Sequence, residues 1–193
     1  MKRFFLSLTV IATVGLVGFA SIIAYVDPFF HYHKPIEGFP YVVDDQVDMN
    51  PGLARNMDYD GVLLGSSMTV NFTASSFERD MGLKLQKLSY NGAYPRDQYN
   101  IMEQVFEYHP SVKRVFLGID ELNYSADVNE TKYPVTDYLY DNNPVNDVKY
   151  LLNKDVMLDY VLKPLVDRSD ATDWDMIYPM WWKPEHYNLA NVR

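Results

Sequence analysis

Hydrophobic positions divide the chain into segments of different character. Phe4–Val26 is almost continuously apolar, whereas residues 27–59 carry four prolines and little periodicity. Residues 59–120 alternate short apolar runs with apolar residues at helical spacing. After a polar, tyrosine-rich stretch, helical spacing returns over residues 145–166. These changes predict an anchor, a connecting segment and a folded domain.

The first apolar run is long enough to cross a membrane. A bilayer-spanning helix needs about twenty apolar residues, and Phe4–Val26 provides them. Lys2 and Arg3 precede it, so the positive-inside tendency keeps the N-terminus cytoplasmic and the rest outside. A cleaved signal peptide is the alternative, although the length of the run favours an uncleaved anchor. We therefore expect a single-pass protein of the cell membrane, with residues 4–26 in the lipid bilayer.

Residues 59–120 predict the order strand, helix, strand, helix, strand. The expected strands are Val62–Leu64, Leu83–Tyr90 and Val112–Ile119, and the expected helices are residues 75–82 and Arg96–Tyr108. Strands that alternate with helices are typical of right-handed parallel crossovers. The sequence therefore predicts an α/β domain over residues 59–193, preceded by a linker or wrap over residues 27–58.

The remainder of the chain predicts no further strand. Residues 127–143 resemble a loop, and residues 145–166 predict a helix that Pro164 ends or kinks. Residues 167–193 are rich in tryptophan, proline and aspartate. Parallel sheets commonly have about four to six strands, so three strands indicate a partial domain from a longer protein.

The amino-acid composition and net charge exclude some classes of site and partner. The 193 residues are 48% hydrophobic, which supports a packed core. The chain has no cysteine, which excludes disulfides and thiolate metal sites. A net charge of -9 disfavours nucleic acid as a partner. The pairs His31/His33 and Asp120/Glu121 are interpreted as interfacial residues and solvated acids rather than metal ligands, so no metal or cofactor is predicted.

Candidate chemistry is concentrated where the predicted strands end. Gly65-Ser66-Ser67 follows the first strand, and a tight turn there presents a hydroxyl above the carboxyl end of a sheet. The structural alternative is a serine that caps a helix. Asn91-Gly92 follows the second strand and is either a plain turn or part of the same site.

Together with the anchor, these blocks resemble the SGNH/GDSL hydrolase superfamily, in particular membrane-anchored bacterial members related to teichoic-acid D-alanyl transfer and polysaccharide O-acetylation proteins. The matching blocks are Tyr59–Ser67, Tyr90–Ala93 and Leu117–Asp120, within about residues 1–125. The resemblance implies a flavodoxin-like three-layer fold around a parallel sheet. It also implies Ser67 as nucleophile, the Gly92 N–H as oxyanion donor, and an envelope polysaccharide or teichoic acid as acceptor.

One departure from the family pattern concerns the oxyanion. The family has Gly-x-Asn-Asp, whereas this chain has Gly118-Ile119-Asp120-Glu121. An ionised carboxylate at position 120 would repel an oxyanion, where the family's asparagine donates a hydrogen bond. Asn91 and Asn123 are the candidate replacements for that donor.

A second departure concerns the general base that activates serine. The family supplies it in Asp-x-x-His, which this chain lacks. The helix before His109 is expected to carry it roughly 20 Å from the carboxyl ends of the strands, so we place His109 at the opposite edge from Ser67. His186 is the one histidine expected to reach the site. Two functions therefore stay open: a serine acyl esterase or acyltransferase, and a catalytically inactive anchored binding module.

Overall fold

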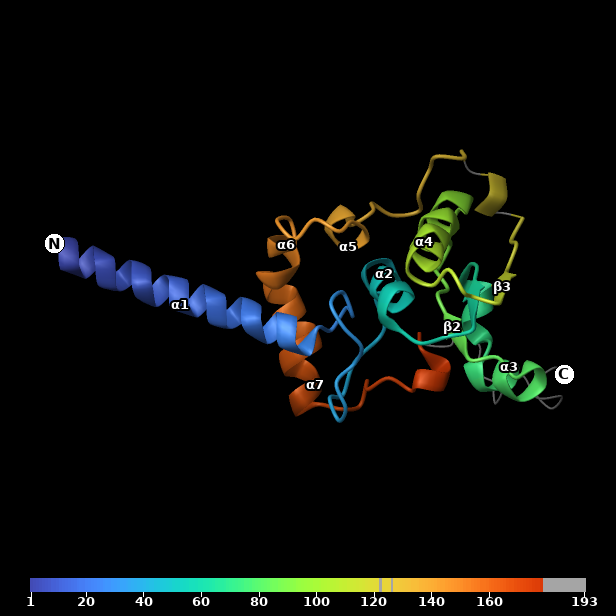
Figure 1. Ribbon diagram of the computed structural model, residues 1–193, viewed down its shortest axis with the longest axis horizontal. Helices are drawn as coiled ribbons and strands as arrows, with labels where there is room; N and C mark the ends of the chain where they lie inside the picture. Colours follow the sequence, from blue (N-terminus) through green and yellow to red (C-terminus); the bar gives the residue numbers. More distant parts are fainter. Residues whose placement is uncertain (122, 126, 179–193) are drawn as a thin grey trace, which may run out of the picture.

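The computed structural model describes residues 1–121, 123–125 and 127–178. Helix α1 (Lys2–Val26) extends away from the folded domain for most of its length (Figure 1). It is long and apolar enough to cross a membrane. Its side chains are exposed as far as Gly18, whereas Ile23 and Val26 near its end are buried. One candidate membrane span is therefore present among the described residues, as predicted.

The domain is built on a parallel sheet in the order β2-β1-β3. Its strands are β1 (Gly61–Leu64), β2 (Leu85–Lys87) and β3 (Arg114–Leu117). Helix η1 (Ser67–Asn71) and α3 (Ala74–Met81) connect β1 to β2, and α4 (Pro95–Tyr108) connects β2 to β3. The predicted α/β class and the strand–helix alternation are confirmed.

Helices cover both faces of this sheet. Val62 and Leu64 point into the main hydrophobic cluster, which α4 completes with Ile101 and Val105. On the other face, Phe77 of α3 meets Phe116 of β3 edge-to-face, with ring centroids 4.9 Å apart. The carboxyl ends of all three strands therefore meet at one edge between two helical layers.

The connecting segment contains a helix that the sequence did not reveal. Helix α2 (Gln46–Asn56) is packed against α4, and its Met49 and Leu53 are fully buried. The sequence does not predict this helix, because Pro51 and Gly52 both disfavour a helix interior. Asp45 caps it by accepting hydrogen bonds from two N–H groups of its first turn. The sequence predicted a linker or wrap without a regular element, and the structure has a helix over these residues instead.

The long helix predicted over residues 145–166 is divided into three parts. They are α6 (Val148–Leu151), the π-type helix η3 (Val156–Leu162) and α7 (Lys163–Val166). The Asn153 side chain interrupts the pattern by accepting from the N–H groups of Asp155 and Val156. Pro164 lies in the first turn of α7, which proline tolerates.

Three short helices complete the described residues. They are η2 (Asn123–Ser125), α5 (Asp137–Tyr140) and η4 (Trp174–Met176). Helix α5 lies within the stretch predicted as loop, and four residues are too few to leave a periodic signal.

Asp27 fastens α1 to the domain. It is fully buried in a left-handed conformation, with φ 48°. Its carboxylate accepts the backbone N–H groups of His31, Tyr32 and His33 at 3.0, 2.7 and 2.9 Å. The Tyr150 hydroxyl donates to the same carboxylate at 3.0 Å. The chain therefore turns around one buried acid as it leaves the helix.

His31 continues this junction into the domain. Its Nε2 lies 3.4 Å from an Asp147 carboxylate oxygen, and both side chains are buried. Burial lowers the pKa of the His31 imidazole, and the nearby Arg55 acts in the same direction. His31 therefore links the turn around Asp27 to the segment that precedes α6.

Candidate functional site

The three candidate blocks lie side by side at the carboxyl edge of the sheet. The Tyr90 N–H donates to the Gly65 carbonyl at 3.0 Å, and the Gly118 N–H donates to the Leu64 carbonyl at 2.8 Å. The segment that enters Gly65-Ser66-Ser67 is thus flanked directly by the blocks that follow β2 and β3. The parallel order with β1 in the centre produces this convergence.

Thr69 packs closely against two glycines of these blocks. A Cβ atom would lie 2.6 Å from Thr69 Cγ2 if placed on Gly65, and 2.4 Å if placed on Gly118. The Thr69 hydroxyl donates to the Ser66 carbonyl at 2.7 Å and contacts Ser89 Oγ at 2.8 Å. Glycine at both positions therefore lets η1 fold tightly over the end of the sheet.

We expect Gly118→Ala to destabilise the domain through this one contact. Overpacking typically costs about 1–3 kcal/mol, and the clash falls on the Thr69 methyl group. Adding Thr69→Ser removes that methyl and keeps the hydroxyl, so the double variant should recover most of the lost free energy of unfolding. Urea unfolding of the full chain, followed by tryptophan fluorescence, measures both variants. A double variant no more stable than Gly118→Ala would contradict the steric explanation.

The two serines occupy different environments. Ser66 is 2% exposed, and its hydroxyl donates to an Asp120 carboxylate oxygen at 3.2 Å. The same Ser66 oxygen accepts the Met68 N–H at 3.4 Å, so Ser66 caps η1. Ser67 is the first residue of η1 and is half-buried. Ser66 therefore has a structural role, and Ser67 is the more accessible of the two.

A cavity of about 510 Å³ adjoins the turn. Its lining residues are Ser66, Met68, Thr69, Gly118, Ile119, Asp120 and Glu121. Ser66, rather than Ser67, lines this hollow, which lies between η1 and the end of β3. The exposed side chains of Met68 and Ile119 give it an apolar rim beside hydroxyl and carboxylate groups. Such a surface suits a ligand that has both an apolar and a polar part.

Asp120 faces the turn, because its carboxylate accepts the hydrogen bond from Ser66. Asn123 Nδ2 lies 3.3 Å from the carboxylate oxygen that also accepts from Ser66. One predicted replacement donor, Asn123, is thus brought to the site. The other, Asn91, is exposed, and its N–H donates to the Gln46 side chain at 2.6 Å. The Asn91 N–H is therefore already used within the fold.

Gly92 has a cationic neighbour that the sequence did not indicate. Gly92 is in a left-handed conformation, with φ 71°, and a Cβ there would lie 3.2 Å from Lys132 Cε. The backbone N–H of Lys132 donates to the Asp97 carboxylate at 2.9 Å. The Lys132 ammonium lies 5.4 Å from the Tyr94 ring centroid. A lysine from the predicted loop thus flanks the predicted oxyanion donor.

Lys87 supports the far end of η1. Its buried ammonium donates to the carbonyls of Val70 and Phe72 at 2.7 and 3.1 Å. Burial lowers the pKa of Lys87 to about 8. The sequence did not predict this buried position of Lys87, because a charged residue in a short strand normally faces solvent.

The histidines that the structure describes do not lie where a catalytic base for Ser67 would be needed. His109 packs on Tyr59, with ring centroids 4.4 Å apart, and Tyr59 precedes β1. The prediction that His109 lies at the edge opposite Ser67 is therefore confirmed. His31 and His33 belong to the junction with α1, and His186 lies outside the described residues. Within residues 1–178, apart from 122 and 126, no group of three or more histidines and acids has the arrangement of a metal site.

No family model, curated protein or solved structure matches this chain. The site consists of a serine turn, two flanking glycine blocks, a carboxylate and an adjoining cavity.

Proposed function

We propose that this protein is a membrane-anchored serine acyl esterase or acyltransferase with a flavodoxin-like SGNH fold. Its domain acts outside the cell membrane on envelope polymers, with a polysaccharide or teichoic acid as acceptor. The observation that carries the proposal is the direct hydrogen bonding between the three blocks at the carboxyl edge of the sheet. An acyl-transfer site needs a nucleophile and oxyanion donors within one such small region.

Each block has a role in the proposed reaction. Ser67 Oγ attacks the acyl carbonyl of an ester donor, and the N–H groups of Ser67 and Gly92 stabilise the oxyanion that forms. The ester bond then breaks, and the donor's alcohol leaves with the proton that the Ser67 hydroxyl has lost. The acyl group then passes to water in an esterase, or to a hydroxyl of the polymer in a transferase. Asn123, held beside Asp120, is the side-chain candidate for a further donor. The cavity beside Ser66 accommodates the apolar part of the acyl group.

An active-serine probe tests the nucleophile. We expect a fluorophosphonate to label the full chain in detergent, because it traps a serine that attacks tetrahedral centres. Ser67→Ala should abolish labelling, since the reacting oxygen is lost. Ser66→Ala is the matched control and should retain labelling, because Ser66 caps η1 rather than attacking.

Two outcomes would contradict this assignment. Equal labelling of Ser67→Ala and the unmodified chain would remove Ser67 as nucleophile. Labelling lost only in Ser66→Ala would transfer the role to the buried serine. Digestion of the labelled protein and tandem mass spectrometry would identify the modified peptide in either case.

A second candidate function is a non-catalytic anchored binding module. The Asp120 carboxylate beside Ser66 favours it, because a negative charge there opposes an oxyanion. Turnover of aryl acetate esters separates the two functions. Hydrolysis that disappears in Ser67→Ala excludes the binding module, and no hydrolysis by the folded chain favours it.

A further inference from the structure

A row of exposed apolar side chains lies on η3 and α7, beside the end of α1. Leu158, Leu162 and Leu165 are 52%, 46% and 52% exposed, and the neighbouring Val166 is also exposed. We refer to these four residues as the leucine row. Leucine at this exposure on several successive turns is unusual for a surface in contact with water alone.

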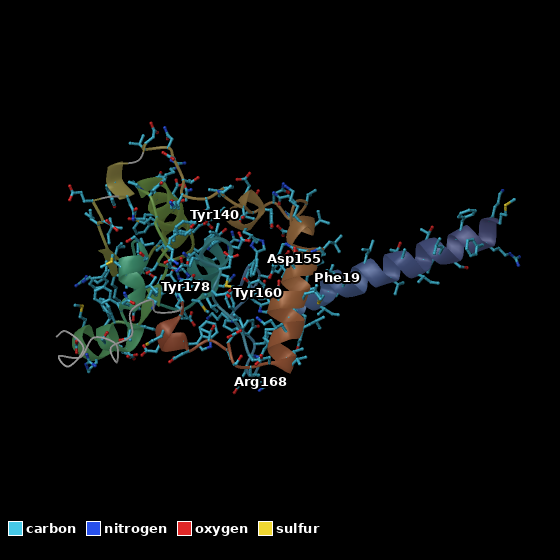
Figure 2. The ribbon with its side chains drawn as sticks, turned by 180° about the vertical axis from the view of Figure 1, so that it is seen from behind. Phe19, Tyr140, Asp155, Tyr160, Arg168 and Tyr178 are labelled. Carbon is cyan, nitrogen blue, oxygen red and sulfur yellow. The ribbon has the colours of Figure 1, made fainter. Side chains whose placement is uncertain are left out.

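The leucine row faces away from the domain. Tyr160, between the first two leucines, packs its ring on Phe29 at 5.1 Å between centroids, and its hydroxyl donates to Asp44 at 3.0 Å. Figure 2 shows Tyr160 on the side of this helix that faces the domain. A step of two residues is roughly half a helical turn, so Leu158 and Leu162 point to the opposite side.

The same helix crosses the end of the membrane anchor. Figure 1 shows α6, η3 and α7 lying across the C-terminal end of α1. Ile23 of α1 belongs to the hydrophobic cluster that contains Val156 and Val161 of η3, and Phe19 packs against that cluster. The leucine row therefore lies at a fixed level along the anchor.

The length of α1 places that level at the membrane. The part of α1 outside the domain runs from Phe4 to Gly18 and measures about 22 Å at 1.5 Å per residue. The hydrocarbon core of a bilayer is about 30 Å thick. The core must therefore extend to about Ile23, where α1 meets η3. Tyr25, exposed on α1 just beyond, suits the aromatic belt of the interface.

We propose that η3 and α7 form a second membrane contact, in which the leucine row inserts into the interface of the lipid bilayer that α1 crosses. The row is apolar, and the charged Asp155, Asp159 and Lys163 form a neighbouring stripe, as in helices that lie in the membrane plane. Two contacts fix the orientation of the domain, which one flexible tether would not. This inference goes beyond the proposed enzymatic function and does not depend on Ser67.

Spin labelling tests the contact directly, because the chain has no cysteine of its own. Leu162→Cys and Leu158→Cys are labelled with a nitroxide, and the full chain is reconstituted in phosphatidylcholine–phosphatidylglycerol vesicles. Val115→Cys is the matched control, since Val115 is apolar and 37% exposed but lies on β3. Accessibility to oxygen, which concentrates in lipid, is compared with accessibility to a water-soluble nickel chelate.

We expect the oxygen-to-nickel ratio at positions 158 and 162 to exceed that at position 115 several-fold. Ratios equal to that of the control would overturn the proposal, because the row would then face water. Protection from both reagents would also overturn it, because protein, such as a second copy of the chain, would then cover the row.

Discussion

Replacing Gly52 by alanine is expected to lower the free energy of unfolding by more than about 3 kcal/mol. A Cβ on Gly52 would lie 2.0 Å from the Phe29 carbonyl oxygen and 2.7 Å from the Phe30 carbonyl group. Both neighbours are backbone atoms, so no side chain can rotate away. Helix α2 must therefore separate from the turn around Asp27, and the packing between them is lost.

The turn around Asp27, which contains Phe29 and Phe30, cannot shift cheaply to admit this methyl group. The Phe29 N–H donates to the Tyr150 hydroxyl at 3.1 Å, and Asn56 Nδ2 donates to the Phe30 carbonyl at 2.7 Å. Moving either residue breaks a hydrogen bond in a buried or half-buried place.

Urea unfolding of the full chain in detergent, followed by tryptophan fluorescence, measures the effect of Gly52→Ala. Trp174 packs edge-to-face on Phe30, with centroids 5.8 Å apart, so its emission reports on this region. Gly15→Ala is the matched control, because it makes the same change in a helix where nothing beyond the local helix backbone lies within 4 Å of the added Cβ. A Gly52→Ala protein as stable as Gly15→Ala would show that α2 and the turn are not in this contact.

Asp27→Ala is expected to destabilise the domain by about 3–5 kcal/mol, the usual effect of removing one partner from a buried charged network. The substitution leaves three backbone N–H groups and the Tyr150 hydroxyl without their shared acceptor. Each unsatisfied buried donor costs about 1–3 kcal/mol before relaxation. Alanine is also disfavoured in the left-handed conformation that Asp27 adopts.

Asp27→Asn relieves both causes in part. Asparagine tolerates the left-handed conformation and keeps one acceptor oxygen, so we expect a loss clearly smaller than that of Asp27→Ala. Thermal unfolding in detergent, monitored by near-ultraviolet circular dichroism, compares the three proteins. Equal stability of Asp27→Ala and the unmodified chain would disprove the structural role of this carboxylate.

Several elements could be predicted because their signals are local. The strands around Val62–Leu64 and Val115–Leu117 are short apolar runs bounded by turn residues, and α4 has regular helical spacing that ends at His109-Pro110. Helix α2 could not be predicted, because Pro51 and Gly52 oppose helix locally and only packing against α4 compensates. Tertiary contacts outweighed intrinsic propensity there.

The candidate site shows the same division. Parallel strand order allowed the three blocks to be placed at one edge, and it allowed His109 to be placed at the other. Lys132 beside Gly92 was missed because it approaches the site from a distant segment. Lys87 beneath η1 was missed because a charged residue in a short strand normally faces solvent. Both lysines are ordinary charged residues in the sequence, and only their neighbours distinguish them.

By itself, the sequence determined the membrane-length helix, the α/β alternation and the serine turn. Each depends on hydrophobic periodicity or on residues adjacent in the chain. Only the tertiary structure decided that Ser66 is buried against Asp120, that Asp27 joins α1 to the domain, and that the leucine row is exposed beside the anchor. Burial and hydrogen bonding between distant residues depend on which surfaces meet after folding, and no local pattern records that.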